Sequence, residues 1–402
     1  MPRPVRRPPS GPAAARIPAG LADLVLNAAS EITRAPTALD ADLLLSTLIG
    51  GGYAAVDPDR GPALDELATV LADRVAGQDS EPARVVGAIL AGTPLDQPGW
   101  PSALGTVRPT GGYAYGDRYG DQTGYVATFA HADEELGGPE HAVIFLVDHT
   151  LGLVKDLVVI APASAVLDQI RGDTDEMTWF APLAPASVRA AAHAYLRATD
   201  LAEELPESES LVANRFLAGQ RLALLPETAE PDPAGDSAPA STPDREELIT
   251  QFLDSPEARL SGLAKASGAR REAVTYGLGL CVDFAGARGG DPLRWSPRAV
   301  EAFLLEWVHG RAVLDGQDAK TLPDVLGAWV SWAGRRVGLP DPAVAATLDR
   351  VDEVREEFVR LCSTGERQSP AVRAMAQLVA EGIDLADPVA VDEWLATYNA
   401  NH

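Results

Sequence analysis

Apolar residues recur every three to four positions through the early part of the chain. Within residues 38–49, ALDADLLLSTLI, we expect Asp40 to cap a strongly apolar helix and Gly50 to end it, at the first of three consecutive glycines. Another helix is expected just before this segment, and residues 63–75 and 82–92 continue the same period. The pattern therefore predicts four packed helices.

The period then changes to the alternation of strands. Strands are predicted over 124–133, 141–149 and 153–162, where β-branched and aromatic residues are common and turn residues intervene. Their short connections make them antiparallel neighbours. Residues 142–148 are apolar at odd and even positions alike, so this strand is expected to be central and covered on both faces. The region is predicted as α+β, with helices resuming at about 162–172, 185–198 and 208–224.

Beyond residue 245 no segment reads as a strand, and the remainder is predicted to be all-helical. Leu322, Val325, Leu326, Trp329 and Ala333 form one apolar stripe at 3.6-residue spacing, as on a helix that packs against a core. The expected helices are 245–254, 257–266, 270–286, 296–308, 321–337, 341–363, 370–381 and 388–398.

Composition suggests where these regions divide. Residues 226–244 are rich in Pro, Ala, Ser and acids and have no apolar period, which is typical of a linker. Residues 1–18 are basic and proline-rich and are expected to be a disordered tail. The prediction is thus an α+β domain at 19–225 followed by an all-α domain at 245–402.

Charge and cysteine content exclude several classes of protein. The 402 residues include 33 Lys and Arg but 58 Asp and Glu, giving a formal charge of −25, so no general affinity for nucleic acid or anionic membrane is expected. Cys281 and Cys362 are too few for a disulfide scaffold or a thiolate zinc site. Without a signal-peptide core or a long apolar run, we expect a cytoplasmic protein.

Four polar residues interrupt the apolar strands at LVDHTLGLVKD. Asp148 and His149 end one strand, and Lys155 and Asp156 belong to the next. With Leu151 and Gly152 at the centre of the turn, Asp148 would face Lys155 across the hairpin as an ion pair, and His149 would find a backbone partner. The alternative is an acid–base or metal-binding centre.

Other polar groups carry weaker signals. The segment GGYAYGDRYGDQTGYV at 111–126 offers Asp117 and Asp121 as ligands for a cation, although an irregular entry to the sheet with glycines at positive φ is favoured. His131 and His141 flank a predicted hairpin loop, and a zinc pair there is set against ordinary surface histidines. Phosphate-loop, nucleophile-elbow and metalloprotease signatures are absent, so no cofactor is expected.

Residues 260–279 resemble a helix-turn-helix. Gly268 suits the turn and Val274 the apolar lock, and Arg270 and Arg271 would open a DNA-reading helix. Gly277 departs from the pattern, and acids outnumber bases in this half of the chain. Five of the seven tryptophans also lie here, where they predict an aromatic core or, alternatively, a surface for a partner: Trp295, Trp307, Trp329, Trp332 and Trp394.

Taken together, the segments YGDRYGDQTGYVATFAH, HAVIFLVDHTLGLVKD, DPLRWSPRAVEAFLLEW and LGAWVSWAGRRVGLP resemble a family of long actinobacterial proteins that has no established activity. The likeness covers most of the chain outside the tail and the linker. It implies a bacterial cytoplasmic setting and transfers no functional residue. We therefore expect a non-enzymatic protein-interaction or regulatory protein, with a DNA-binding regulator and a hydrolase or metal-dependent enzyme around Asp148 as the alternatives.

Overall fold

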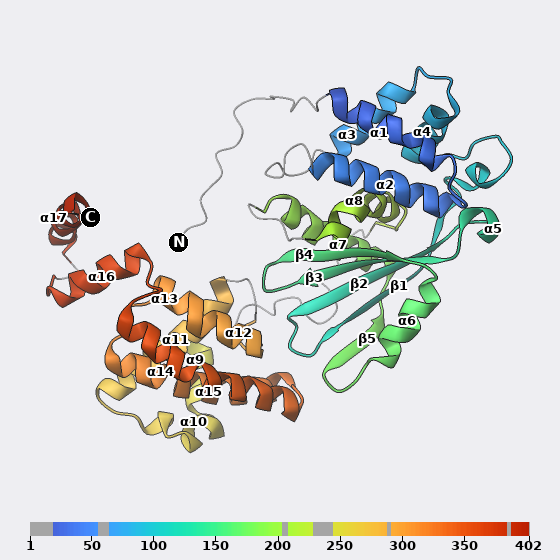
Figure 1. Ribbon diagram of the computed structural model, residues 1–402. Helices are drawn as coiled ribbons and strands as arrows, with labels where there is room; N and C mark the ends of the chain where they lie inside the picture. The colour runs from blue at the N-terminus through green and yellow to red at the C-terminus, as the bar shows by residue number, and fades with distance from the viewer. Residues whose placement is uncertain are drawn as a thin grey trace. The chain divides into compact units, whose positions relative to one another are not determined.

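The computed structural model describes residues 19–54, 64–202, 208–227, 244–287, 291–383 and 387–401. The chain divides between residues 238 and 239 into two compact units. The expected tail at 1–18 and residues 228–243 of the expected linker lie outside the described residues. Each unit has its own hydrophobic core residues (Figure 1).

The four predicted helices at the start of the first unit are confirmed as α1 Ala19–Ile32, α2 Ala38–Ala54, α3 Leu64–Val75 and α4 Glu81–Ala91. Two details of the prediction for α2 are wrong. The backbone N–H of Asp40 donates to Thr37 Oγ1 at 3.2 Å, so Thr37 takes the capping role that was expected of Asp40. The helix also continues through its glycines to Ala54. Gly50 lies against α8 (Glu209–Ala223), where an added Cβ would overlap the carbonyl oxygen of Val212.

A five-stranded antiparallel sheet forms the centre of this unit, in the order β4-β3-β2-β1-β5. The three predicted strands are present, and two were missed. The strands are β1 Arg108–Asp117, β2 Gln122–Ala130, β3 His141–Asp148, β4 Leu153–Ile160 and β5 Thr178–Pro182, of which β1 and β5 are the additions.

The glycine-rich stretch before β2 belongs to strand β1, which has one irregularity in its pairing, between Pro109 and Gly111, and the expected run of glycines at positive φ is wrong. Among the glycines of 111–126, Gly120 alone has a positive φ, of 80°, in the turn between β1 and β2. The others permit close approach of neighbouring groups. A Cβ on Gly112 would lie 2.5 Å from the Leu183 carbonyl oxygen, and one on Gly124 would overlap the ring of Tyr115.

The two faces of the sheet are covered by different helices (Figure 1). Helices α7 (Pro185–Asp200) and α8 pack against Phe145, Val143 and other residues of one face. Helix α6 (Ala163–Gly172) covers Val126 and Ile144 on the other face. The short helix α5 (Glu134–Gly137) lies between β2 and β3 in the chain. Strand β3 is accordingly buried on both faces, as its continuous apolar run predicted. Helix α2 lies over α8, where Ser46 Oγ donates to the Ala213 carbonyl at 2.6 Å.

The described part of the second unit is helical, as predicted. It contains α9 Arg245–Leu253, α10 Pro256–Leu260, α11 Ala269–Ala287, α12 Pro297–Glu301, α13 Val308–Arg311, α14 Gly316–Val337, α15 Asp341–Thr364, α16 Pro370–Ala380 and α17 Pro388–Asn401. A π-helical turn at Ala302–Trp307 joins α12 to α13, and a 3-10 turn, η2 (Leu263–Lys265), replaces the second half of the helix expected at 257–266.

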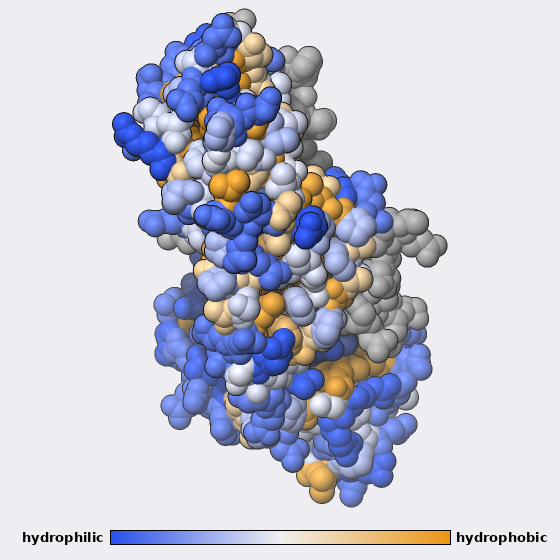
Figure 2. Space-filling view, turned by 90° about the vertical axis from the view of Figure 1, so that its right-hand side faces the viewer, coloured by the Kyte–Doolittle hydropathy of each residue, from blue (hydrophilic) through white to orange (hydrophobic). Residues whose placement is uncertain are grey.

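The tryptophan-rich core expected in this unit is largely confirmed. Trp295, Trp329 and Trp332 are buried, and the apolar stripe of α14 points into the same cluster. Trp307 and Trp394 are half-buried. None of the described helices is long and apolar enough to cross a membrane. The space-filling view shows a face covered mostly by hydrophilic residues, with hydrophobic residues in smaller patches among them (Figure 2).

Candidate functional site

Asp148 closes the turn between β3 and β4. Its side chain is fully buried, and one carboxylate oxygen accepts hydrogen bonds from the backbone N–H groups of Thr150 at 2.9 Å and Leu151 at 3.1 Å. The residue across the ladder from Asp148 is Leu153, so the predicted pairing with Lys155 is wrong. The carboxylate therefore stabilises a turn of four residues, 149–152, where a turn of two, Leu151 and Gly152, was predicted.

Lys155 is the extra residue of a β-bulge that the prediction did not include. The ladder pairs Val147 with Val154 but Leu146 with Asp156, which leaves Lys155 without a partner on β3 and exposed to solvent. The N–H of Val154 donates instead to Thr199 Oγ1 on α7, at 2.8 Å. Lys155 lies away from Asp148 because the turn contains four residues, 149–152, and not the two that were expected, so that Asp148 pairs with Leu153.

His149 binds side-chain hydroxyls through both ring nitrogens. Nδ1 lies 2.9 Å from the hydroxyl of Tyr195 on α7, and Nε2 lies 2.9 Å from Thr123 Oγ1 on β2. A backbone partner for the ring was expected, whereas it is the backbone N–H of His149 that meets the main chain, at the carbonyl of Asp121. With both nitrogens engaged, the imidazole ties β2 to α7.

Asp156 faces a third set of partners. It accepts hydrogen bonds from the hydroxyls of Ser208, at 2.8 Å, and Ser210, at the start of α8. Partial burial raises the pKa of Asp156, but the bonds from Ser210 and Ser208 outweigh it and lower the pKa overall. The side chain of Asp148 thus contacts the turn, that of His149 contacts β2 and α7, that of Asp156 contacts the start of α8, and Lys155 is exposed to solvent.

Asp117 organises the turn between β1 and β2. Its carboxylate accepts hydrogen bonds from the N–H groups of Gly120 at 2.8 Å, Asp121 at 3.1 Å and Gln122 at 2.7 Å. Those three donors take up the lone pairs that a cation would need. The arrangement therefore favours a structural role for Asp117 over the cation site that was considered.

His131 and His141 do come together, with ring centroids 6.0 Å apart, but they are buried and are not the surface histidines that were expected. Arg221 on α8 donates from Nε to His141 Nε2 at 3.1 Å, and from a terminal nitrogen to Asp42 on α2 at 2.5 Å. Burial lowers the pKa of His131 to about 4 and that of His141 to about 3, with Arg221 adding to both effects.

This buried network does not suit a zinc ion. Arg221 occupies the Nε2 lone pair of His141 and would place a guanidinium cation beside the metal. Among the described residues, no three His, Cys, Asp or Glu side chains gather as metal ligands. Sequence reading missed Asp42 and Arg221 because they are 179 residues apart and belong to separate apolar helices.

Residues 260–279 start at the last residue of the single-turn helix α10 and contain the 3-10 turn η2 and then α11, which begins at Ala269. Gly268 has a φ of 57° before α11, and Val274 is buried. Arg270 and Arg271 are exposed in the first turn of α11. Gly277 faces α14, where an added Cβ would lie 3.1 Å from Leu322 Cδ1. The expected first helix of the motif is thus replaced by two shorter turns.

A hollow lies between α16 and α17 in the second unit. Ser369 caps α16 by accepting from the N–H of Val372 and is tied to Gly310 by its hydroxyl, at 3.0 Å. Asp387 caps α17 by accepting from the N–H of Val389. Both caps precede a proline at the first helical position, the start signal that the sequence also shows at 296–297 and 341–342.

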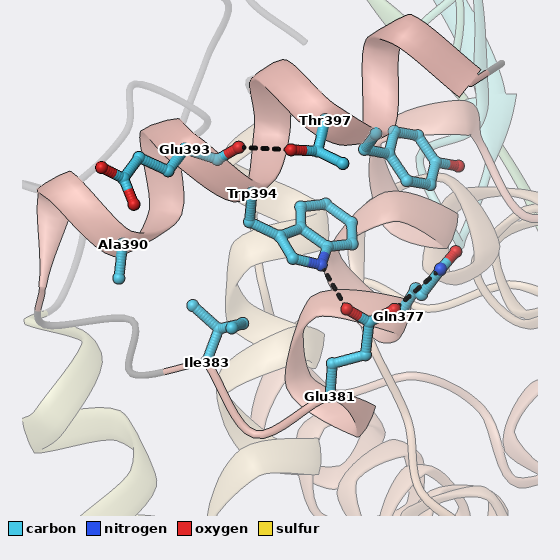
Figure 3. Close-up of a pocket in the computed structure, with 8 residues that line it drawn as sticks. Gln377, Glu381, Ile383, Ala390, Glu393, Trp394 and Thr397 are labelled. Carbon is cyan, nitrogen blue, oxygen red and sulfur yellow. Dashed lines mark hydrogen bonds between the residues drawn. The ribbon is translucent and has the colours of Figure 1, made fainter.

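We call this hollow the α16–α17 groove. Its volume is about 400 Å³. The rings of Trp394 and Tyr398 stack with centroids 4.9 Å apart, one helical turn apart on α17 (Figure 3). Ile383 and Ala390 add apolar surface, and Glu381 and Glu393 bring two carboxylates. The residues that line it are Gln377, Glu381, Ile383, Ala390, Glu393, Trp394, Thr397 and Tyr398.

Glu381 fixes the position of the tryptophan ring. The Trp394 indole N–H donates to its carboxylate at 2.6 Å, and Gln377 donates to the other carboxylate oxygen at 2.9 Å (Figure 3). Bonds from Gln377 and Trp394 lower the pKa of Glu381, so this carboxylate stays ionised below the usual range of a glutamate. The indole is thereby held in one orientation with its apolar surface half-buried.

Apolar side chains near the groove are unusually exposed. Four of the ten large hydrophobic residues that are exposed in the described chain belong to α16 and α17: Met375, Val379, Val389 and Leu395. None of these four lines the groove itself, and single exposed apolar residues are ordinary, but several on the two helices that form a hollow favour an interaction surface. The sequence singled out Trp394 only as one of five tryptophans, because the hollow depends on how two helices pack.

No protein-family model, no curated protein and no solved structure matches this chain.

Proposed function

We propose that this protein is a non-enzymatic, cytoplasmic interaction protein, and that the α16–α17 groove binds an apolar and positively charged segment of a partner protein. One observation carries the proposal: the stacked pair Trp394 and Tyr398 stands half-buried beside Glu381 in a hollow of about 400 Å³. Tryptophan and tyrosine are enriched among the residues that dominate binding energies at interfaces.

The lining of the groove defines the chemistry of the partner. An aliphatic or aromatic anchor would lie against Ile383, Ala390 and the Trp394 ring, and an arginine or lysine would lie beside Glu381 and Glu393. The chain as a whole is acidic, with a formal charge of −25, so a basic segment is also attracted to it over longer distances.

The hydrogen-bond partners of the residues considered for catalysis also favour a non-enzymatic protein. Asp148, His149 and Asp156 each bind hydrogen-bond partners that hold a turn or join elements of the fold. Catalytic groups need a shared point at which a substrate atom can sit about 3 Å from each of them. The partners that these three side chains meet in those hydrogen bonds belong to different elements of the fold: the turn after β3, helix α7 with strand β2, and the start of α8.

The test starts with capture of partner proteins on the immobilised full chain. The affinity of the chain for the purified partner is then measured. Trp394→Ser is expected to weaken binding about 30-fold or more, as loss of an interface residue worth about 2 kcal/mol does. Leu260→Ser is the matched control, since Leu260 is an exposed apolar residue of the same unit on α10. Equal affinities for Trp394→Ser and the unchanged chain would refute the proposal, as would a turnover that Asp148→Ala abolishes.

A further inference from the structure

We propose that the α16–α17 groove binds an arginine side chain of the partner protein, with its planar guanidinium stacked on the indole of Trp394 and hydrogen-bonded to the carboxylate of Glu381. This inference rests on the proposed function of the groove and deepens it. The proposed function allows arginine or lysine in the partner, whereas the geometry at Trp394 selects arginine over lysine and over methylated lysine.

The carboxylate of Glu381 lies at the edge of the indole ring. The Trp394 N–H donates to one of its oxygens at 2.6 Å, and Gln377 donates to the other at 2.9 Å (Figure 3). Each carboxylate oxygen has two lone pairs, so these two neutral donors leave both oxygens able to accept again. A cation placed over the indole face therefore has a negatively charged acceptor within reach of its N–H groups.

The aromatic rings of the groove present flat faces. The planes of Trp394 and Tyr398 differ by 20°, so the two faces are nearly parallel and do not turn toward a common point. A quaternary ammonium is recognised by a cage of several ring faces around one cation, and two parallel rings do not form such a cage. A guanidinium is planar and more weakly hydrated than an ammonium, so it stacks on a single flat face at a smaller cost of desolvation.

Arginine already stacks on tryptophan elsewhere in the same unit. The guanidinium carbon of Arg311 lies 5.4 Å from the ring centroid of Trp307, and that of Arg336 lies 5.4 Å from the ring centroid of Trp332. Both contacts are within the distance at which an aromatic face attracts a cation. In the groove, we expect the same pairing with an arginine that the partner supplies.

Positive charge is scarce in the sequence around the groove. Residues 370–402 contain five Asp and Glu but a single Lys or Arg, which is Arg373. The guanidinium of Arg373 donates to the carbonyl of Gln368, before the start of α16, at 3.1 Å. A positive charge beside Glu381 is therefore expected from the partner, and its attraction to the groove should weaken with added salt.

The test compares four peptides by nuclear magnetic resonance of 15N-labelled indoles in the full chain. The peptides are blocked at both ends and have the sequence Leu-Ala-X-Ala-Leu, where X is arginine, lysine, trimethyl-lysine or citrulline. Trimethyl-lysine keeps the charge without the plane, and citrulline keeps the plane without the charge.

We expect the arginine peptide to shift the Trp394 signal, which is assigned through Trp394→Phe, in a saturable way. Its affinity should exceed that of each other peptide at least about threefold, as for a stacked cation at an accessible site. The signals of Trp295 and Trp329, which are buried in the core, should not move.

Two substitutions that remove the same charge separate the two glutamates of the groove. Glu381→Gln should weaken arginine binding about threefold, because it removes the charge of the exposed carboxylate beside the indole but keeps an oxygen that can accept from Trp394. Glu393→Gln is the matched control and should weaken it less, because the Glu393 carboxylate points away from the Trp394 ring (Figure 3).

Three results would overturn the inference. The first is a lysine or trimethyl-lysine peptide that binds as tightly as the arginine peptide. The second is an equal loss of affinity for Glu381→Gln and Glu393→Gln. The third is the lack of a saturable shift of the Trp394 signal with the arginine peptide.

These outcomes are separable from those of the proposed function. If Trp394→Ser abolishes binding of the purified partner but the four peptides bind alike, the groove binds partners and its selection of arginine is refuted. If arginine is selected but Trp394→Ser leaves partner binding unchanged, the arginine site exists and the proposed function is refuted. When both hold, replacement of the bound arginine of the partner by lysine should weaken binding about threefold.

Discussion

At the scale of single residues, burial decides what each polar group does. Arg221 and Asp42 form an ion pair that is almost entirely removed from solvent, and His141 accepts a further hydrogen bond from the same guanidinium. Removal of one partner from such a pair costs about 3–5 kcal/mol, because the remaining charge stays buried. The network therefore fixes how α2 and α8 meet the end of the sheet.

The buried histidines make the stability of the first unit depend on pH. In the folded protein the pKa of His131 is about 4 and that of His141 about 3, against about 6.5 in the unfolded chain. Below pH 6.5 the unfolded chain therefore takes up protons that the folded chain does not. Stability is complete above that pH and falls by about 1.4 kcal/mol per pH unit for each histidine until the folded pKa is reached.

We predict that His131→Gln removes one histidine's share of this loss. Between pH 6.5 and pH 5.0 the variant should lose about 2 kcal/mol less stability than the unchanged chain. Urea unfolding monitored by pulse proteolysis of the first unit at the two pH values measures the difference. His193→Gln, an exposed position on α7, is the control and should keep the full pH dependence. Identical slopes for all three proteins would contradict the pKa assignments.

At the scale of elements, two local devices shape the first unit. The bulge at Lys155 sets the register of β4 against β3, and the carboxylate of Asp148 closes the turn that joins them. Gly50 of α2 lets that helix approach α8 until backbone meets backbone at Val212. Each of these two features can be tested by a pair of substitutions, one at a residue that makes the contact and one at a residue of the same region that does not.

For the hairpin, we predict that Asp148→Ala and Lys155→Ala act independently. Loss of the Asp148 acceptor leaves two turn N–H groups without it and should cost at least about 1 kcal/mol. Lys155→Ala should change the free energy of unfolding by less than about 0.5 kcal/mol. A double-mutant cycle should give a coupling energy near zero. A coupling approaching about 1 kcal/mol would restore the cross-strand ion pair.

For α2, we predict opposite effects at adjacent glycines. Gly50→Ala introduces a Cβ that overlaps the Val212 carbonyl oxygen and should destabilise the unit by about 1–3 kcal/mol. Gly51→Ala meets no atom within 4 Å and should stabilise it by about 0.5–1 kcal/mol, since alanine is the better helix former. Urea midpoints of the two variants decide the matter, and stabilisation by both would mean that α2 and α8 are not in close contact.

At the scale of the whole molecule, the chain comprises two units whose buried apolar residues form separate clusters. The core of the second unit is built around Trp295 and Trp329, and that of the sheet around Phe129 and Phe145. Separate cores imply separate stabilities, because each unit loses its own buried surface when it unfolds.

We therefore predict that Trp295→Ala destabilises the second unit alone. The variant should lose about 3–5 kcal/mol there, as expected for truncation of a buried tryptophan. Hydrogen exchange measured by mass spectrometry should show faster exchange in α11 and α14 and unchanged exchange in β2 and β3. Equal loss of protection in the strands would show that the two units unfold as one.

Much of the architecture could be predicted from local patterns. The helical periods of the second unit, the burial of β3 on both faces and the helix starts at Ser296 and Asp341 all depend on residues close together in the sequence. Strand β1 was missed because its glycines suggest turns in isolation, although they are required by the rings and carbonyls that pack beside them. Strand β5 carries too short a pattern to be recognised alone.

By itself, the sequence determined the α+β and all-α regions, because amphipathic periods and capping residues act within a few positions of one another. The register at Lys155, the pairing of Arg221 with Asp42 and the hollow beside Trp394 were decided only by tertiary structure. Each depends on groups brought together from separate elements, and an extra residue in a strand or the approach of two helices leaves no periodic trace in the sequence. The residues that carry the proposed function belong to this second kind.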